Sequence, residues 1–193
     1  MDARIIRYSE QPELWEGWFG DGSGEVWPEY NQHGEELNAY WGRLYEVFPE
    51  WQFLLYDDDQ KVILAEGHTI PLVWDGDEGE APTAVSALAA EIPSRHQGRG
   101  LARQMLNAMK HLTGEAGLPW LIAPVRPSMK DRYPTIPIER YAHWTRDDGT
   151  PFDPWIRAHT WLGARIGPVI PRWLHIGGTG EYWEPNVWII HQA

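Results

Sequence analysis

The sequence predicts one mixed α/β domain over residues 1–193. Three observations predict it. Short apolar runs typical of strands are interspersed with segments whose apolar residues repeat at helical spacing. A chain of 193 residues that is 42% hydrophobic is long enough to bury a core of its own. Repeats, low-complexity tracts and linkers are absent from the sequence, so nothing in it indicates a second domain.

The expected elements alternate along the whole chain. They are a strand at 3–9, helices at 11–19 and 34–48, a hairpin at 51–74, a strand at 83–92, a helix at 101–112, a strand at 118–125, a helix at 154–163 and two strands within 168–192. Between the last two helices lies a long segment rich in proline and aromatic residues, at about 126–152. A connection of that length beside a compact core is more often functional than idle.

Local signals justify each element. The first strand alternates apolar and polar residues, and the acidic run at 57–60 marks the turn of the hairpin. The helix at 34–48 carries apolar residues three and four positions apart and ends at Pro49. The helix from 101 has the same spacing and ends near Gly114 and Gly117. Asp153 followed by Pro154 is a helix N-terminus signal.

The charge and the cysteine count exclude several classes of protein. The net charge is −12, and residues 1–94 carry 4 basic against 20 acidic residues. Such a chain offers no basic patch for nucleic acid, and no apolar run is long enough for a membrane span. Without cysteine there are no disulfides or thiolate sites, and the opening residues lack signal-peptide character. We expect a cytoplasmic protein.

The stretch "RHQGRGLA", residues 95–102, follows a predicted strand and leads directly into a helix. The first turn of a helix exposes N–H groups without intrahelical partners, and the helix dipole adds partial positive charge there. Gly98 and Gly100 allow close approach, and Arg95, Arg99 and Arg103 raise the local positive potential. The pattern therefore predicts an anion site for a phosphate or diphosphate. The alternative is a glycine turn that only joins strand to helix.

Other motifs are absent or weak. The sequence has no Walker-type loop and no dinucleotide-binding glycine motif near its start, and "GGTG" at 177–180 precedes strand-like residues and predicts a turn. The eight histidines show no ligand spacing, so we expect no metal site.

The stretch "QGRGLA" resembles the acyl-CoA signature Q/R-x-x-G-x-G/A of the GCN5-related N-acetyltransferases (GNAT), with Gln97, Gly100 and Ala102 at the fixed positions. The predicted element order matches that family along nearly the whole chain. The segment "HTWLGARI" resembles the family's Y-x-x-L-G-F helix ending. The pattern "APVRPS…RYP…PFDPW" resembles an uncharacterised bacterial subgroup of acetyltransferases.

The resemblance implies a mostly antiparallel sheet with a splayed central strand pair and flanking helices. It implies acetyl-CoA as co-substrate, without a metal. The pantetheine arm would add to the strand at Ala90 to Ile92. The diphosphate would bind the loop around Gln97; the full set expected to hold the cofactor is Ala90, Ile92, Gln97, Gly98, Arg99, Gly100, Leu101 and Ala102.

Acetyl transfer to an amine needs a base for the amine and a proton for the leaving thiolate. Glu91 ends the cofactor-binding strand and is our candidate base, with Glu66 and His68 as the other candidates. The alternative for Glu91 is a solvent-facing or arginine-paired carboxylate. Aligning "HTWLGA" with the family motif puts His159 where a tyrosine usually protonates the thiolate, so an imidazolium there is the candidate acid. The alternative is a histidine packed against Trp155 or Trp161.

The segment at 126–152 is expected to line the acceptor site, with Arg126, Ser128, Lys130 and Tyr133 as substrate-binding candidates. Opposite it lie the acidic N-terminal half and its Trp15, Trp18, Trp27 and Tyr30. The sequence therefore predicts an N-acyltransferase for a small or amino-acid-like amine. The alternatives are an inactive CoA-binding sensor of the same fold and a phosphate-binding hydrolase. A homodimer and a monomer are both compatible with the sequence.

Overall fold

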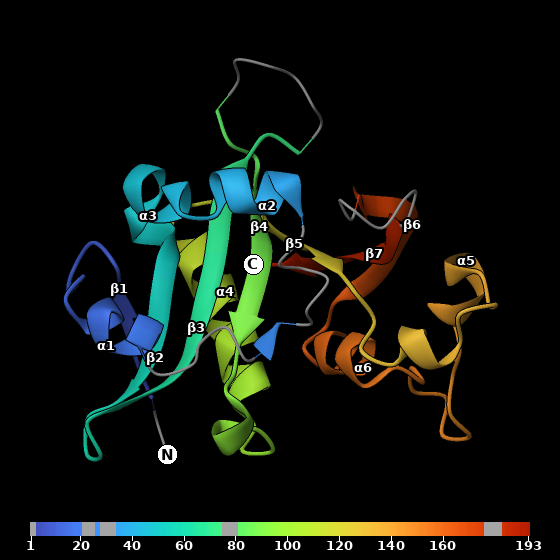
Figure 1. Cartoon of the computed structure of the whole chain (residues 1–193). Coiled ribbons are helices and arrows are strands. Elements are labelled where there is room, and N and C mark those ends of the chain that lie inside the picture. Colours follow the sequence, from blue (N-terminus) through green and yellow to red (C-terminus); the bar gives the residue numbers. More distant parts are fainter. Residues whose placement is uncertain (1–2, 21–25, 28–33, 75–80, 176–182) are drawn as a thin grey trace.

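The computed structural model describes residues 3–20, 26–27, 34–74, 81–175 and 183–193. Seven strands form one sheet (Figure 1). The strands are β1 (Arg4–Arg7), β2 (Gln52–Asp57), β3 (Val62–Leu72), β4 (Ala84–Glu91), β5 (Trp120–Val125), β6 (Arg165–His175) and β7 (Trp183–Gln192). The helices are α1 (Leu14–Gly20), α2 (Glu35–Tyr40), α3 (Arg43–Val47), α4 (Leu101–Glu115), α5 (Ile138–Tyr141) and α6 (Pro154–Trp161).

The predicted order of elements is confirmed, with two corrections: the segment at 126–152 contains a short helix, α5, that was not expected, and the helix expected before the hairpin is divided. The helix expected at 34–48 is two short helices, α2 and α3, separated at Trp41 and Gly42. A single apolar stripe spans both because α3 continues the turn that α2 ends, and glycine is a poor residue for a helix interior. The expected turn at 177–180 and Tyr30 lie outside the described residues.

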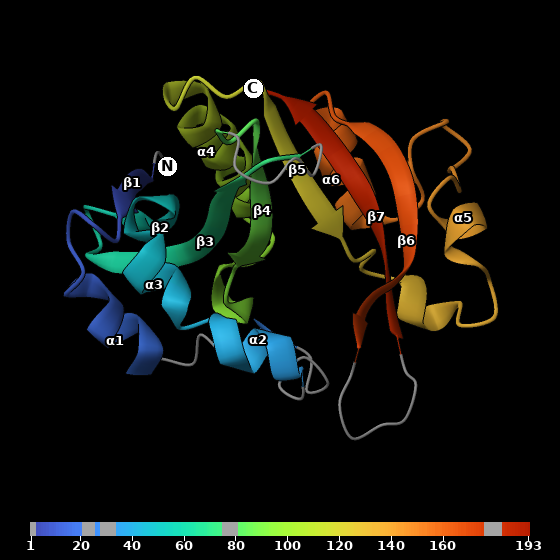
Figure 2. The same ribbon diagram turned by 90° about the horizontal axis from the view of Figure 1, so that it is seen from above.

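The strand order is β1-β2-β3-β4-β5-β7-β6, and every neighbouring pair is antiparallel except β4 and β5. That parallel pair has only three register partners, from Ala84 opposite Trp120 to Ser86 opposite Ile122. Beyond them the two strands diverge, as Figure 2 shows from above. Pro124 lies on β5 past the last pair. Proline fits there because it has no N–H to give to a neighbouring strand.

Helices cover both faces of the sheet (Figure 2). On one face α4 packs against β3, β4 and β5 and also contacts α6. The other face carries α1, whose Trp15 and Trp18 are buried together with Leu54 of β2. Phe53 and Leu55, the neighbours of Leu54, belong to the large core under α4. The alternation of side chains along β2 thus separates two apolar clusters. Within the described residues, no helix is long and apolar enough to cross a membrane.

Gly67 in the middle of β3 lies directly under α4. A Cβ atom built there would lie 2.3 Å from Cζ of Phe53, its partner on β2, and 2.7 Å from Cε of Met105 on α4. The absence of a side chain at Gly67 lets the helix and the phenyl ring close over the strand. Close packing of this kind tolerates an added methyl group poorly.

We predict that Gly67→Ala lowers the free energy of unfolding by about 1–3 kcal/mol because it overpacks this contact. Gly114→Ala is the matched control: its Cβ meets nothing within 4 Å, and it lies inside α4. That change should raise stability by up to about 1 kcal/mol, since alanine favours a helix interior. Urea unfolding of both variants checks the prediction, which would be wrong if the two changes had the same sign.

Candidate active site

A cavity of about 690 Å³ lies where β4 and β5 diverge. Its floor is the second half of β4, where three small residues, Ala87, Ala89 and Ala90, leave room before Glu91. Trp27, Tyr40 and Trp41 form one wall, and Trp155 and His159 of α6 form another. Arg126 and Ser128, just past β5, also line it. This size and this mostly apolar lining with a few polar groups are typical of small-molecule sites.

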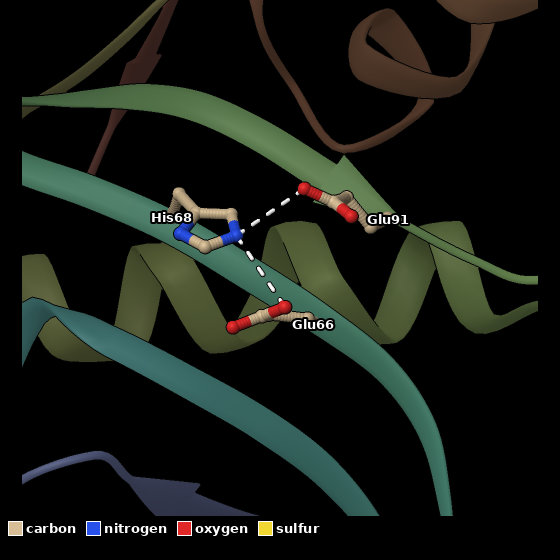
Figure 3. A group of neighbouring side chains, drawn as sticks. All are labelled: Glu66, His68 and Glu91. Atoms are coloured by element: carbon tan, nitrogen blue, oxygen red, sulfur yellow. Dashed lines mark ion pairs between the residues drawn. The ribbon is translucent and has the colours of Figure 1, made fainter. Parts of the chain in front are cut away.

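Glu66, His68 and Glu91 form a buried triad beside this cavity (Figure 3). Glu66 lies directly opposite Glu91 in the β3–β4 register, and His68 is two residues along β3, so all three share one face. The His68 Nε2 atom lies 3.3 Å from Glu91 Oε1 and 3.6 Å from Glu66 Oε2. Glu91 alone of the three also lines the cavity. Two carboxylates directly opposite each other would repel, so the histidine between them is electrostatically necessary.

Neutral donors hold the other end of Glu66. The Tyr45 hydroxyl donates to Glu66 Oε1 over 2.8 Å, and the Trp15 indole N–H donates to the same oxygen. Indole nitrogen is only a donor, so Glu66 accepts there as a carboxylate. Burial raises the pKa of the Glu66 carboxyl, but His68 and these donors outweigh it, so the pKa lies below its usual value. Burial and the Glu66 charge in turn raise the pKa of the Tyr45 hydroxyl.

Gln52 fixes the proton on the other ring nitrogen of His68. Its Nε2 donates to the carbonyls of Phe48 and Thr69, each at 3.0 Å. The amide oxygen is therefore the atom that faces His68 Nδ1, 3.0 Å away. Because an amide oxygen only accepts, Nδ1 carries a hydrogen. Burial lowers the pKa of His68, but Glu66 and Glu91 outweigh it and raise the pKa to about 9.

The triad also has the composition of a metal site, since one ligand atom from each residue lies within 4.8 Å of the others. The sequence missed this grouping because it arises from strand register and not from spacing along the chain. The distances from His68 Nε2 to the two carboxylates also make the group an ion-paired triad, with the histidine between the two glutamates.

The glycine loop has the geometry expected of an anion site. Gly98 and Gly100 both have left-handed backbone angles, with φ of 75° and 77°. Gly100 is the N-cap of α4 and supplies no side-chain hydrogen bond. The N–H groups of Arg103 and Gln104 donate to the Gly100 carbonyl, so those of Leu101 and Ala102 precede the helical bonds. A Cβ at Gly98 or Gly100 would meet open space, so the loop faces solvent with its backbone exposed.

Gln97 braces this loop. Its Nε2 donates to the Ile92 carbonyl over 2.9 Å, so it ties the end of β4 to the glycine turn. The side chain expected at the cofactor thus acts on the protein backbone, and the Ile92 carbonyl already has one partner. Ala90 lines the cavity, whereas Ile92 and the residues from Gln97 to Ala102 lie outside its lining. The expected cofactor site therefore has two parts that lie close together in the sequence: the end of β4 and the glycine loop that follows it.

His159 lines the cavity but differs from what the sequence suggested. It is buried, its Nδ1 lies 2.8 Å from His191 Nε2, and the Trp155 ring packs edge-on against it. Burial and the neighbouring His191 lower the pKa of His159 to about 3. The expected imidazolium is therefore absent near neutral pH, because a charged ring would have neither solvent nor a carboxylate beside it. Its Nε2 has no hydrogen-bond partner among the described residues.

Two of the four substrate-binding candidates lie away from the cavity. The Lys130 ammonium donates to the Tyr133 carbonyl, and the Tyr133 ring packs on Tyr141, Trp144 and Phe152. These residues hold the insertion together, because aromatic rings are more stable packed than solvated. Arg126 and Ser128 do reach the cavity. Trp15 and Trp18 are buried beneath it, and Trp27 lines it.

Asp153 joins the insertion to α6. As the N-cap it accepts from the N–H groups of Trp155 and Ile156, which confirms the expected cap. The same carboxylate accepts from the Met129 N–H at 2.9 Å and from the Tyr141 hydroxyl at 3.0 Å. Burial and the Asp153 charge raise the pKa of Tyr141, so its hydroxyl stays a donor. The insertion therefore cannot move independently of the helix that carries His159.

Asn186 is a cavity residue that the sequence did not indicate. Its Nδ2 donates to the Pro124 carbonyl over 3.2 Å, and its Oδ1 is buried without a partner among the described residues. A buried acceptor of this kind is costly unless a ligand or water satisfies it. No local pattern marks it, because it reaches the cavity from β7.

We predict that His159 makes stability fall in acid. Its pKa is about 3 in the folded chain against about 6.5 unfolded, so the unfolded chain binds the proton first. The stabilising contribution is present above pH 6.5 and is lost as the pH falls toward 3, at about 1.4 kcal/mol per pH unit. His159→Gln should reduce the loss between pH 6.5 and 4.5 by about 2 kcal/mol. Urea unfolding at several pH values measures it, and the exposed His143→Gln should leave the slope unchanged.

Comparison with known proteins supports the fold. No family model matches the sequence. An arginine N-acetyltransferase of Aspergillus versicolor is 25% identical over an alignment that covers 82% of this chain and 66% of that protein, so the chain spans just under two thirds of its relative. The fungal source leaves the bacterial subgroup a prediction.

Solved structures match over nearly the full chain. The loading GNATL domain of CurA from Lyngbya majuscula gives a TM-score of 0.73 at 19% identity, covering 98% of this chain and 96% of that one. The GphF GNAT-like decarboxylase, solved with isobutyryl-CoA, gives 0.71 at 16% identity, covering 100% and 99%. An acetyltransferase from Salmonella typhimurium, solved with acetyl-CoA, gives 0.54 at 15% identity, covering 100% and 94%. The chain therefore has the GNAT fold.

Proposed function

We propose that this chain is an N-acetyltransferase that moves an acetyl or other short acyl group from acyl-CoA to the amine of a small, amino-acid-like acceptor. The observation that carries the proposal is the position of Glu91. It ends β4, lines the cavity opened by the divergence of β4 and β5, and lies a few residues before the glycine loop that leads into α4. Base, cavity and anion site thus follow one another along a single strand–loop–helix unit.

Two parts of coenzyme A fit this unit: the pantetheine arm fits β4, and the diphosphate fits the glycine loop. The backbone of β4 from Ala87 onward has no register partner on β5, so an extended pantetheine arm can add there as a strand. The N–H groups from Gly98 to Ala102 then receive the diphosphate at the N-terminus of α4. Acyl-CoA complexes of two structural neighbours agree with this ligand. Asn186 Oδ1 is a further acceptor for an N–H of the ligand.

The reaction is direct transfer. The amine nitrogen attacks the thioester carbonyl carbon, the C–N bond forms, and the C–S bond breaks. Glu91 takes a proton from the nitrogen, and the departing thiolate takes one from water. His159 is neutral, so its role is a hydrogen bond from Nε2–H to the sulfur or carbonyl oxygen in the tautomer that His191 allows. Alignment of amine and thioester in the cavity supplies much of the rate.

The acceptor we propose is a cationic amino acid such as arginine, the substrate named for the fungal relative. The carboxylate of Glu91 and the aromatic rings of Trp27 and Trp41 suit a positive group, while Arg126 can pair with an acceptor carboxylate. The same negative charge disfavours an acyl group that carries a carboxylate, which argues against the decarboxylation named for GphF. We also propose a cytoplasmic location and leave monomer and homodimer as the two states to be measured.

The sensor alternative makes an opposite prediction for turnover. A protein that only holds acyl-CoA would bind it but release no thiol with any amine. We expect thiol release from acetyl-CoA in the presence of arginine, and no conversion of malonyl-CoA to acetyl-CoA and carbon dioxide. Binding of acetyl-CoA without thiol release across an amine panel would establish the sensor and refute the transferase.

Glu91→Gln should lower kcat on the order of 100-fold or more, because the amide cannot accept the amine proton. Acetyl-CoA affinity should stay within about twofold, since the diphosphate site is unaltered. The exposed Glu139→Gln is the matched control and should retain full activity. Steady-state thiol release and calorimetry measure the two quantities. Equal activity of the two variants would remove Glu91 from the mechanism.

Gly100→Ala should weaken CoA binding by about tenfold, because the new Cβ projects into the open space that the diphosphate would occupy. Gly117→Ala is the control: it has the same left-handed strain, with φ of 70° against 77°, but lies beyond the far end of α4. Both should lose similar stability, about 1 kcal/mol. Calorimetry with CoA compares them, and equal affinities would place the diphosphate elsewhere.

A further inference from the structure

The divergence of β4 and β5 explains where Glu91 lies but not why a second glutamate and a histidine are buried behind it. Glu66 and His68 do not line the cavity, and each is at most 1% exposed. Burying two carboxylates and an imidazole is costly unless their charges and hydrogen bonds are matched. We therefore expect the arrangement to offset this cost, either through stabilising contacts or through an effect on the chemistry of Glu91.

The hydrogen-bond directions settle the proton on His68. The Gln52 amide nitrogen is engaged by two carbonyls, so its oxygen receives Nδ1–H. Nε2 then faces Glu91 and Glu66. A lone pair aimed at two carboxylates in a buried site would be repelled by both. A proton on Nε2 turns the same contact into two ion pairs, so the geometry requires the imidazolium.

We propose that His68 is a positioning residue for acyl transfer: its imidazolium, fixed by Gln52 and Glu66, pairs with the Glu91 side chain and holds it turned so that the carboxylate can accept the acceptor's proton. This rests on the proposed function. The resting triad carries one net negative charge, which also favours an acceptor that arrives as an ammonium ion. When Glu91 takes the amine proton the triad becomes neutral, and release of that proton to solvent restores it.

The surroundings of His68 suit a permanent charge. Tyr45 of α3 stands edge-on to the ring at 5.9 Å between centroids, and Trp41 packs tilted on it at 4.7 Å. The titratable groups that face it are Glu66 on β3, Glu91 on β4 and Tyr45, whose hydroxyl remains protonated. β2 contributes the neutral Gln52. The two carboxylates next to Nε2 and the Gln52 oxygen next to Nδ1 favour the charged ring.

The pH profile of kcat/KM separates this role from a structural one. His68→Gln keeps an N–H donor near Glu91 but removes the charge, which leaves Glu91 beside Glu66. The acidic limb of the profile should move up by about one pH unit or more. Activity at pH 6.5 should then fall about tenfold or more and recover partly at higher pH, while acetyl-CoA affinity is unchanged.

A second variant tests the cause of that shift. Glu66→Gln combined with His68→Gln removes the repelling carboxylate along with the imidazolium. The acidic limb should then return toward that of the unmodified protein, which loss of packing alone would not produce. His111→Gln is the matched control, because His111 is an exposed histidine paired with Glu115, and its profile should not change. An unshifted limb in His68→Gln would overturn the proposal.

A direct measurement on the unmodified protein does not depend on folding of any variant. Nitrogen-15 NMR of the histidine rings should show His68 protonated on both nitrogens at pH 7. A neutral His68 would overturn the proposal, as would stoichiometric Zn²⁺ or Mn²⁺ bound by the triad in the purified protein. Failure of the proposed function looks different: no acetyl transfer to any amine, with the His68 imidazolium still present.

Discussion

The divergence of β4 and β5 after three register pairs is the constraint on which the rest of the site depends. It opens the middle of a seven-stranded sheet, so a cavity forms without a break in the core beneath it. It leaves the backbone of β4 from Ala87 onward available to a ligand. It also places the end of that strand, with Glu91, at the mouth of the loop that begins α4. Pro124 on β5 fits such an opening, because it has no N–H to give to a neighbouring strand.

Much of the fold was predictable because its signals are local. The helical spacing before Gly117, the acidic hairpin turn and the Asp153 cap are each encoded within a few residues. The division of residues 34–48 into α2 and α3 was not predictable, because the apolar stripe continues across Gly42. The glycine loop could also be predicted from neighbouring residues, since a strand, two glycines and a helix follow one another.

The parts of the site that depend on tertiary contacts were predicted least well. Glu66 and His68 were expected only as other candidate bases, because the β3–β4 register that sets Glu66 opposite Glu91 cannot be read from the sequence. His159 lines the cavity, but its charge depends on His191 from the far end of the chain. Lys130 and Tyr133 looked like ligand-binding residues because their packing partners come from later in the insertion.

The two buried histidines at the site, His68 and His159, have opposite protonation states. His68 lies between carboxylates and keeps its proton, whereas His159 lies against another imidazole and gives its proton up. The first state costs desolvation of three charges, which Trp15, Tyr45 and Gln52 offset with hydrogen bonds. The neutral His159–His191 pair buries no charge near neutral pH, so its desolvation cost is small. The cavity is thus acidic at Glu91 and uncharged at His159.

The Asp153 junction has a consequence for redesign of the acceptor specificity. One carboxylate fastens the start of α6, the Met129 backbone and the Tyr141 hydroxyl together. A loop transplanted from another enzyme in place of residues 126–152 would lose the last two anchors and leave the carboxylate underbonded. A single replacement at Arg126 keeps the Asp153 contacts, whereas a replacement at Ser128 removes a hydroxyl that donates to Asp153 Oδ1 over 3.4 Å, and a grafted loop removes the Met129 and Tyr141 contacts as well.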